Sequence, residues 1–250
     1  LVDAIEYQLN KAVEAFKKAY LDATTGEYGV GCDSYYVTLG DAAVLSEGTS
    51  YADIVAAELE VEYAELADAA LTTAGIEGYV AANAEEIAKA DLITVSLGTN
   101  DISGFVLEQV EAYVNGADTT IDWTALNLDK EIMDVLFGAL SETHAFLAEQ
   151  LTGAETVDLG FAKVDPVELI TLMVDSYLYG TLSFSLNFAP ALNAIHAANP
   201  EAHVVVVGMA NPFEAVVEMM GIEDLDINAV LDAVTSITNL EFLVYTMLTP

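Results

Sequence analysis

Arginine is missing from this sequence, and only six lysines stand against 41 acidic residues. Without a guanidinium group the chain has no bidentate clamp for phosphate, so phosphoryl-transfer chemistry loses a favoured tool. The formal net charge of -35 would repel nucleic-acid phosphates and an anionic membrane surface alike. We therefore expect no nucleic-acid partner. We also expect an acidic, self-repelling surface that suits a salty or calcium-rich extracellular or cell-surface setting.

Cysteine is almost absent, because Cys32 is the only one in the chain and no internal disulfide can form. We interpret this thiol, in the Gly-rich run "GVGCDSYY", as a small structural residue rather than a nucleophile. A long apolar run is missing too. The longest uncharged stretch, 176–200, is interrupted by Asn187, Pro190, Asn193 and His196. A membrane-spanning helix needs about 20 predominantly apolar residues, so the sequence predicts no membrane span.

Apolar residues are abundant by contrast. They make up 54% of the 250 residues, which is enough for a large core, so the chain is not a disordered acidic polymer. Residues 3–20 repeat apolar side chains at helical spacing. We expect an N-terminal amphipathic helix and loop over 1–34, followed by one domain over 35–250. Because the chain begins at Leu1 without a charged and apolar leader, we expect a trimmed or mature segment.

Four short runs, rich in β-branched and aromatic residues, predict strands. They are "YYVTLG" (35–40), "VEYAELA" (61–67), "DLITVSLG" (91–98) and "HVVVVGMANPF" (203–213). Helical patterns stand between and after them. One helix over 50–60 begins at Ser50 as its N-cap, and helices continue to about 150 around a loop at 115–123. Residues 166–198 predict a helix with breaks at Gly180 and Pro190, and the last 25 residues are predicted to be helical.

Strands that alternate with helices predict βαβ units, right-handed crossovers and a parallel sheet covered on both faces, which is an α/β fold. Ligands of such sheets bind at the carboxyl ends of the strands. That rule brings three loops to one rim: the Gly40–Asp41–Ala42 turn, "LTTAG" (71–75) and "GTND" (98–101).

These motifs, taken in order, resemble the GDSL or SGNH hydrolases, a family named for Ser, Gly, Asn and His in four separated blocks. "YVTLGDAAVLSEG" (36–48) is similar to the first block and "LITVSLGTND" (92–101) to the third. "NPEAHVVVVGMANPF" (199–213) is similar to the next core strand and its Asn-Pro exit. The resemblance covers roughly residues 35 to 215. It implies a three-layer α/β/α, flavodoxin-like sheet and a serine esterase or lipase that needs no cofactor or metal. Its substrate would be a small acyl ester, a lipid or an acetylated carbohydrate.

The resemblance also assigns roles to single residues. Ala42 stands at the nucleophile position that the family fills with Ser, and Asp41 precedes it. Three groups would hold the oxyanion: the N–H of Ala42, that of Ala70 (or of Gly75 if the loop shifts), and the side-chain amide of Asn100. Four further residues would line the site: Gly40, Gly98, Thr99 and Asp101.

The fourth block, Asp-x-x-His, has no match. The residues three positions before His144, His196 and His203 are Ser, Asn and Pro, so we interpret the three histidines as non-catalytic. The domain over 35–250 is therefore expected to lack the family's last strand and its catalytic Asp/His loop. Ser46, about one helical turn beyond Ala42, is too distant to replace the nucleophile, and Ser34 is a loop residue.

Three functional classes remain open. The first is an ester hydrolase that is inactive as written, whether engineered, truncated or both. The second is a pseudoenzyme that binds a ligand without chemistry, and the third is a surface-display spacer. Asp41 and Asp101 also have a simpler interpretation as turn and cap residues. The run "DLDIN" (224–228) lacks the Gly and Glu of an EF-hand, so we expect no metal.

Overall fold

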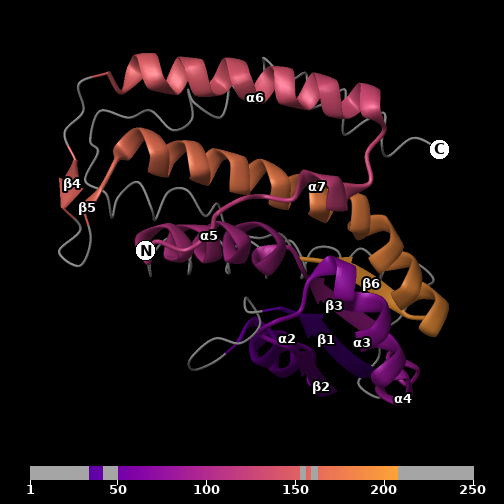
Figure 1. Ribbon diagram of the computed structural model, residues 1–250. Helices are drawn as coiled ribbons and strands as arrows, with labels where there is room; N and C mark the ends of the chain where they lie inside the picture. The colour runs from indigo at the N-terminus through magenta and orange to yellow at the C-terminus, as the bar shows by residue number, and fades with distance from the viewer. Residues whose placement is uncertain (1–33, 42–49, 153–155, 159–162, 208–250) are drawn as a thin grey trace. The chain divides into compact units, whose positions relative to one another are not determined.

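A computed structural model describes residues 34–41, 50–152, 156–158 and 163–207 (Figure 1). The predicted N-terminal helix, Cys32, Ala42, Ser46 and the run 224–228 lie outside these residues. So do the helices predicted near the C-terminus. The described chain forms two compact units: residues 34–101 with 187–207, called here the sheet unit, and residues 102–186, called the helical unit.

The sheet unit is built on four parallel strands. They are β1 (Tyr35–Gly40), β2 (Glu62–Ala67), β3 (Leu92–Ser96) and β6 (His203–Val206), in the order β2-β1-β3-β6. All four coincide with predicted strands, so the prediction of an α/β fold with a parallel sheet is confirmed. The inner strands are almost wholly buried, which explains their unbroken apolar and β-branched sequences.

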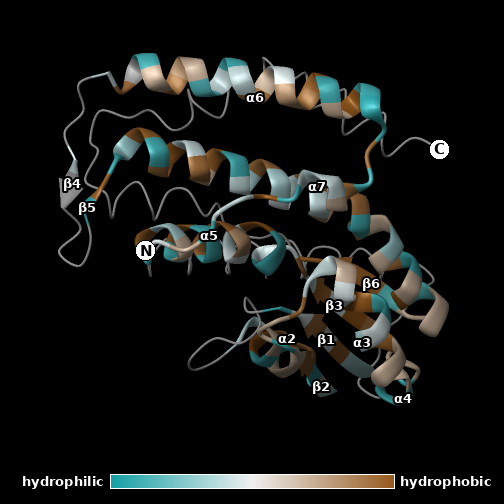
Figure 2. Ribbon diagram, viewed as in Figure 1, coloured by the Kyte–Doolittle hydropathy of each residue, from teal (hydrophilic) through white to brown (hydrophobic). Residues whose placement is uncertain are grey.

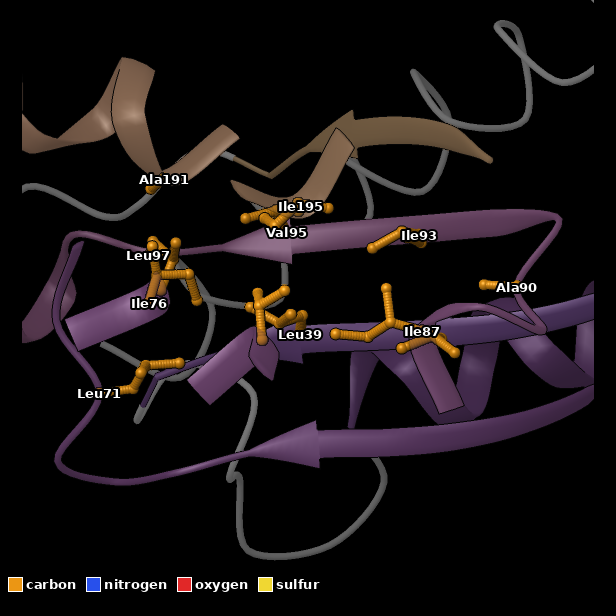
Figure 3. Close-up of a cluster of buried hydrophobic side chains, with 12 residues drawn as sticks. Leu39, Leu71, Ile76, Ile87, Ala90, Ile93, Val95, Leu97, Ala191 and Ile195 are labelled. Carbon is orange, nitrogen blue, oxygen red and sulfur yellow. The ribbon is translucent and has the colours of Figure 1, made fainter. Parts of the chain in front are cut away.

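One face of the sheet carries the larger apolar core. Val37, Leu39, Ile93 and Val95 point to this face, because alternate residues of a strand share a side. Figure 3 shows three of them, Leu39, Ile93 and Val95, with the side chains that pack on them. Side chains from three helices cover them: α3 (Ile76–Ala82), α4 (Ala84–Ile87) and the last turns of α7 (Pro166–Ala198). The most deeply buried members include Val37, Ile93 and Ile195, each at 0% exposure.

The opposite face packs against α2 (Tyr51–Leu59), through Tyr36, Leu92 and Val55. It also holds a hydroxyl network: Tyr36 Oη lies 2.7 Å from Thr94 Oγ1, and Thr38 Oγ1 lies 2.9 Å from Tyr51 Oη. Burial raises the pKa of both tyrosines, so they remain neutral hydroxyls. Helices therefore cover both faces of the sheet.

The start of α2 follows the predicted capping chemistry. The Ser50 hydroxyl accepts from the Asp53 N–H at 3.1 Å, and the Asp53 carboxylate accepts from the Ser50 N–H at 2.8 Å. This reciprocal pair is a capping box, which satisfies two N–H groups that the first turn leaves without helical partners. The helix ends at Leu59, and its C-cap residue, Glu60, has a φ of 53°.

The helical unit contains η2 (Thr99–Gly104) from residue 102 onward, α5 (Phe105–Val114), η3 (Trp123–Leu126), α6 (Lys130–Gln150) and α7 up to residue 186. Leu147 of α6 packs near Leu169 of α7, while Leu136 packs near Leu182, so the two helices run antiparallel. Hydrophilic and hydrophobic residues alternate along α6, as expected for a helix with one buried stripe (Figure 2).

Two features differ from the sequence predictions. α7 runs without interruption through Gly180 and Pro190, so the predicted breaks are wrong. Burial of Leu178 and Leu182 in the helical unit, and of Ala191 and Ile195 in the sheet unit, outweighs penalties of about 1 kcal/mol for Gly and about 3 kcal/mol for Pro. A two-residue antiparallel pair, β4 (Val157–Asp158) with β5 (Lys163–Val164), was not predicted, because two residues show no periodicity.

Among the described residues, α7 is the one helix that is long and apolar enough to cross a membrane, and core helices of soluble proteins meet the same test. The absence of a membrane span therefore stays a prediction.

Asn199 joins α4 to the start of β6, and its replacement tests this packing. Its side-chain Nδ2 donates to the carbonyls of Ile87 and Ala90 at 2.8 Å each, and its Oδ1 accepts from two N–H groups in the turn before β6. Asn199→Ala removes four hydrogen bonds at a buried position, although the Ile87 carbonyl still accepts from the Ala90 N–H, so we expect the free energy of unfolding in urea to fall by about 2–4 kcal/mol. Asn193→Ala, at an exposed position of α7, is the control and should change it by less than about 0.5 kcal/mol. Equal losses in the two variants would contradict the role assigned to Asn199.

Candidate functional site

The sheet order creates a topological switch point between β1 and β3. The chain leaves β1 toward β2 on one side and leaves β3 toward β6 on the other. In open α/β sheets the crevice beside such a point, at the carboxyl ends of the strands, is the usual ligand site. The rim, as used below, consists of Gly40–Asp41 after β1, residues 68–75 after β2, and residues 97–101 after β3.

Asp41 connects the first and third loops. Its side chain is fully buried, and its Oδ2 accepts from the N–H of Thr99 at 2.7 Å and from the N–H of Asn100 at 3.3 Å. Its own N–H donates to the carbonyl of Ser96 at 3.0 Å. A buried carboxylate is costly unless it is hydrogen bonded, so these N–H groups hold it in place and it holds them.

Asn100 connects the third loop to the second. Its Nδ2 donates to the carbonyls of Ala69 and Leu71, at 2.8 Å each. A carboxamide has two N–H donors, and both are used here. The second loop is also joined to β1 directly, because the Asp68 N–H donates to the Gly40 carbonyl at 3.1 Å. The three loops that the sequence places on one rim are thus brought together.

Asp101 makes a third link across the rim. Its carboxylate accepts from the Thr73 N–H at 3.0 Å and from the Thr73 hydroxyl at 2.5 Å. Burial raises the pKa of Asp101, the Thr73 bonds lower it, and the nearby Asp41 charge raises it further. Two carboxylates therefore share this rim, each stabilised by N–H or O–H donors.

The third loop owes its shape to Gly98 and to the π-helical turn η2. Gly98 has a φ of 112°, a backbone conformation that L side chains rarely adopt. Thr99 and Asn100 begin η2, so their N–H groups are free of regular helix bonds and point to Asp41. Single π-helical turns of this kind occur frequently at functional sites.

The groups assigned to the oxyanion already have partners. The Ala70 N–H donates to the Asp68 carboxylate at 2.9 Å, and the Gly75 N–H donates to the Thr72 carbonyl at 3.0 Å. Both donors of the Asn100 amide are engaged as well. Ala42, the fourth assigned residue, lies outside the described residues. To accept a hydrogen bond from Asn100, the carbonyl oxygen of a substrate would have to replace the carbonyl of Ala69 or Leu71.

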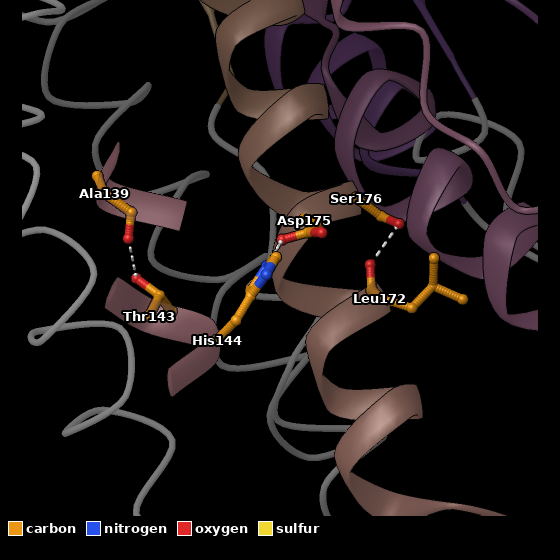
Figure 4. Close-up of polar contacts among 6 residues, drawn as sticks. All are labelled: Ala139, Thr143, His144, Leu172, Asp175 and Ser176. Atoms are coloured by element: carbon orange, nitrogen blue, oxygen red, sulfur yellow. Dashed lines mark hydrogen bonds and ion pairs between the residues drawn. The ribbon is translucent and has the colours of Figure 1, made fainter. Parts of the chain in front are cut away.

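His144 has a partner in the helical unit. Its Nε2 lies 2.7 Å from Asp175 Oδ1, which joins α6 to α7 (Figure 4). Burial raises the pKa of Asp175, and His144 lowers it. The hydroxyl protons of Thr143 and Ser176 go to backbone carbonyls one turn earlier in their own helices, so neither is donated to His144 (Figure 4).

Within the described ranges, no group of three or more His, Cys, Asp or Glu side chains is placed to hold a metal ion. Thr73 and Asp68 were not predicted as site residues. Thr73 binds Asp101, which lies 28 residues further along the chain, and Asp68 binds the N–H of Ala70, two residues further on. The signal for Asp68 was its position two residues before Ala70, the spacing of an Asx turn.

Comparison of the chain with protein-family models and with curated proteins finds no match.

Asn100→Asp tests the link between the second and third loops. The new carboxylate would face two carbonyl oxygens, so we expect the free energy of unfolding to fall by about 1–3 kcal/mol and the amides of residues 70–73 to exchange faster. Asn193→Asp makes the same charge change at an exposed position of α7. Urea unfolding and hydrogen exchange of the two variants measure the difference. Equal stability losses and equal exchange rates in the two variants would show that the Asn100 bonds do not stabilise the second loop.

Thr73→Val tests the environment of Asp101. The folded-state pKa of Asp101 already lies above the ordinary value of 3.8, so stability from this group is lost as pH rises through the folded pKa. Removing the Thr73 hydroxyl raises that pKa further. The variant should therefore lose about 1–3 kcal/mol at neutral pH and clearly less near pH 3.8, as measured by urea unfolding at each pH. Thr72→Val, at the neighbouring position, should show no such pH dependence, and an equal loss at both pH values in Thr73→Val would contradict the assignment.

Proposed function

We propose that this chain is a carboxyl-ester hydrolase-like domain of the GDSL/SGNH type, catalytically silent as written. The observation that carries the proposal is the rim, where Asp41, the second loop and Asn100 meet at the switch point. The order β2-β1-β3-β6 supports it, because it matches the first four positions of the doubly wound order 2-1-3-4-5.

The chemistry follows from the groups at the rim. In an active domain of this type, a Ser at position 42 would attack an ester carbonyl, and the carbonyl oxygen would become an oxyanion. Backbone N–H groups and the Asn100 amide would stabilise that charge. A base would take the hydroxyl proton and return it to the leaving alcohol, and water would then release the acid. The substrates would be small acyl esters, lipids or acetylated carbohydrates, in an extracellular or cell-surface setting.

Ala42 removes the attacking atom from this scheme. Loss of the nucleophilic Ser in a well-studied protease costs about 10⁶ in rate, which is about 8 kcal/mol of barrier. No oxyanion donor offsets a loss of that size. The chain as written should therefore bind a substrate of this class without turning it over.

A non-catalytic binding domain is the second candidate, and one observation favours it. The N–H groups of Ala70 and Gly75 and both donors of Asn100 are bonded within the protein. Electrostatic catalysis needs preorganised donors that are aimed at the developing charge. Donors that hold the loops together are instead typical of a rim that shapes a binding surface without accelerating a reaction.

Ala42→Ser with an external base tests the proposal. Because no catalytic histidine is assigned, imidazole is supplied in solution, with p-nitrophenyl acetate as the substrate. We expect one acetyl group on the peptide that contains position 42, detected by mass spectrometry, because the N–H of residue 42 and the Asn100 amide, released from the second loop, would stabilise the oxyanion.

Ala43→Ser is the matched control, since it adds the same hydroxyl one residue further along the chain. It should stay unlabelled under the same conditions, as should the unchanged protein. No acetylation at position 42, or equal acetylation at positions 42 and 43, would contradict an ester-hydrolase rim and would favour the binding domain.

A further inference from the structure

Cationic partners for the acidic residues are scarce. Three ion pairs occur among the described residues: Lys89–Glu86 and Lys130–Asp134, each at 2.6 Å, and His144–Asp175 at 2.7 Å. Both lysine pairs are exposed and join residues three or four positions apart, and such a pair contributes little and is weakened by salt. Ion pairs therefore cannot balance a net charge of -35.

Tyrosine hydroxyls bind several carboxylates, and one of these, Glu86, also pairs with Lys89. Tyr35 donates to Glu86 and Tyr113 donates to Glu168, each at 2.8 Å. Tyr63 donates to Asp53, and this bond raises the pKa of Tyr63 to about 12, so the donor is neutral. A bond from a neutral donor to a carboxylate keeps the negative charge in place. It is also much less sensitive to ionic strength than an ion pair.

Aspartates in turns show the same pattern with N–H donors. Four of them accept from backbone N–H groups two residues further on: Asp68, Asp118, Asp122 and Asp165. These Asx-type bonds need no cation. The local structure of this chain is therefore held by carboxylates that remain negatively charged.

The helix ends carry unfavourable charges. No basic residue occupies the last turn of α2, α3, α4, α5 or α6, and in the described part of the chain only α7 has one, His196. Glu111 and Glu149 are exposed in the last turns of α5 and α6, where the negative end of the helix dipole repels them. Dissolved salt screens both this repulsion and the repulsion between surface carboxylates.

We propose that folding of this protein depends on dissolved salt, whose cations screen a surface that the chain itself leaves unneutralised. The screening length falls from about 10 Å at 0.1 M to about 3 Å at 1 M ionic strength. Long-range repulsion is therefore removed, while the tyrosine–carboxylate and Asx-type bonds stay intact. The inference concerns the cation atmosphere as a whole, and it is independent of the proposed ester chemistry.

Urea unfolding of the full chain in about 0.05 M and about 2 M NaCl, repeated with KCl, tests the proposal directly. We expect the urea midpoint to rise by about 1 M or more at the higher concentration, with either cation. A midpoint that is flat or falls would overturn the proposal. So would a rise that needs millimolar CaCl₂ and does not occur with NaCl, because a specific calcium site would then be responsible.

Glu149→Gln and Tyr113→Phe separate screening from hydrogen bonding. Glu149→Gln should raise the midpoint by about 0.2–0.5 M in low salt and leave it unchanged in high salt, because the repulsion it relieves is screened there. Tyr113→Phe should lower the midpoint by the same amount at both concentrations, and Ser141→Ala, an uncharged exchange on α6, should also be independent of salt. A Glu149→Gln effect that is equal at both concentrations would overturn the proposal.

Discussion

The buried carboxylate of Asp41 is the constraint on which the rim depends. It lies at the end of β1 with no exposed surface, and backbone N–H groups of Thr99 and Asn100 hold it. Because β1 and β3 are neighbours with connections on opposite sides, these bonds fix the crevice at the point where it opens. The side chain of Asn100 then continues this hydrogen-bond network to the second loop. One acid and one amide therefore join segments that come from three strands.

The rim and the acidic surface show the same chemistry at different depths. A chain with no arginine and six lysines must satisfy its carboxylates with N–H and O–H groups. Asp41 and Asp101 do so in the interior, and Asp53 and Glu168 do so nearer the surface. In the interior this arrangement gives a rigid, hydrogen-bonded rim. At the surface it leaves the charge in place, so solution ions must screen it.

The sequence predicted the structure correctly where the local preference of a segment for strand or helix agrees with its place in the fold. The run over 35–40 is apolar and β-branched and forms β1 with the predicted bounds, and Ser50 caps α2 as expected. The meeting of the three loops followed from the parallel topology alone. The uninterrupted course of α7 through Pro190 was not predictable, since it depends on the burial of Ala191 and Ile195 against other segments. The partners of Asn100 and Thr73 were hidden for the same reason, because each bond joins residues about 30 positions apart.

The proposed ester-hydrolase function requires position 42 and the side-chain amide of Asn100 to lie on the same side of the switch point, where both could reach one carbonyl oxygen. A nuclear Overhauser effect between the methyl protons of Ala42 and the side-chain amide protons of Asn100 tests it most directly. We expect a clear cross-peak, together with cross-peaks from the same amide to the second loop. Strong cross-peaks from this amide to the second loop, with none to Ala42, would contradict the proposed function. The hydrogen bonds of the rim would then be structural, without an oxyanion site.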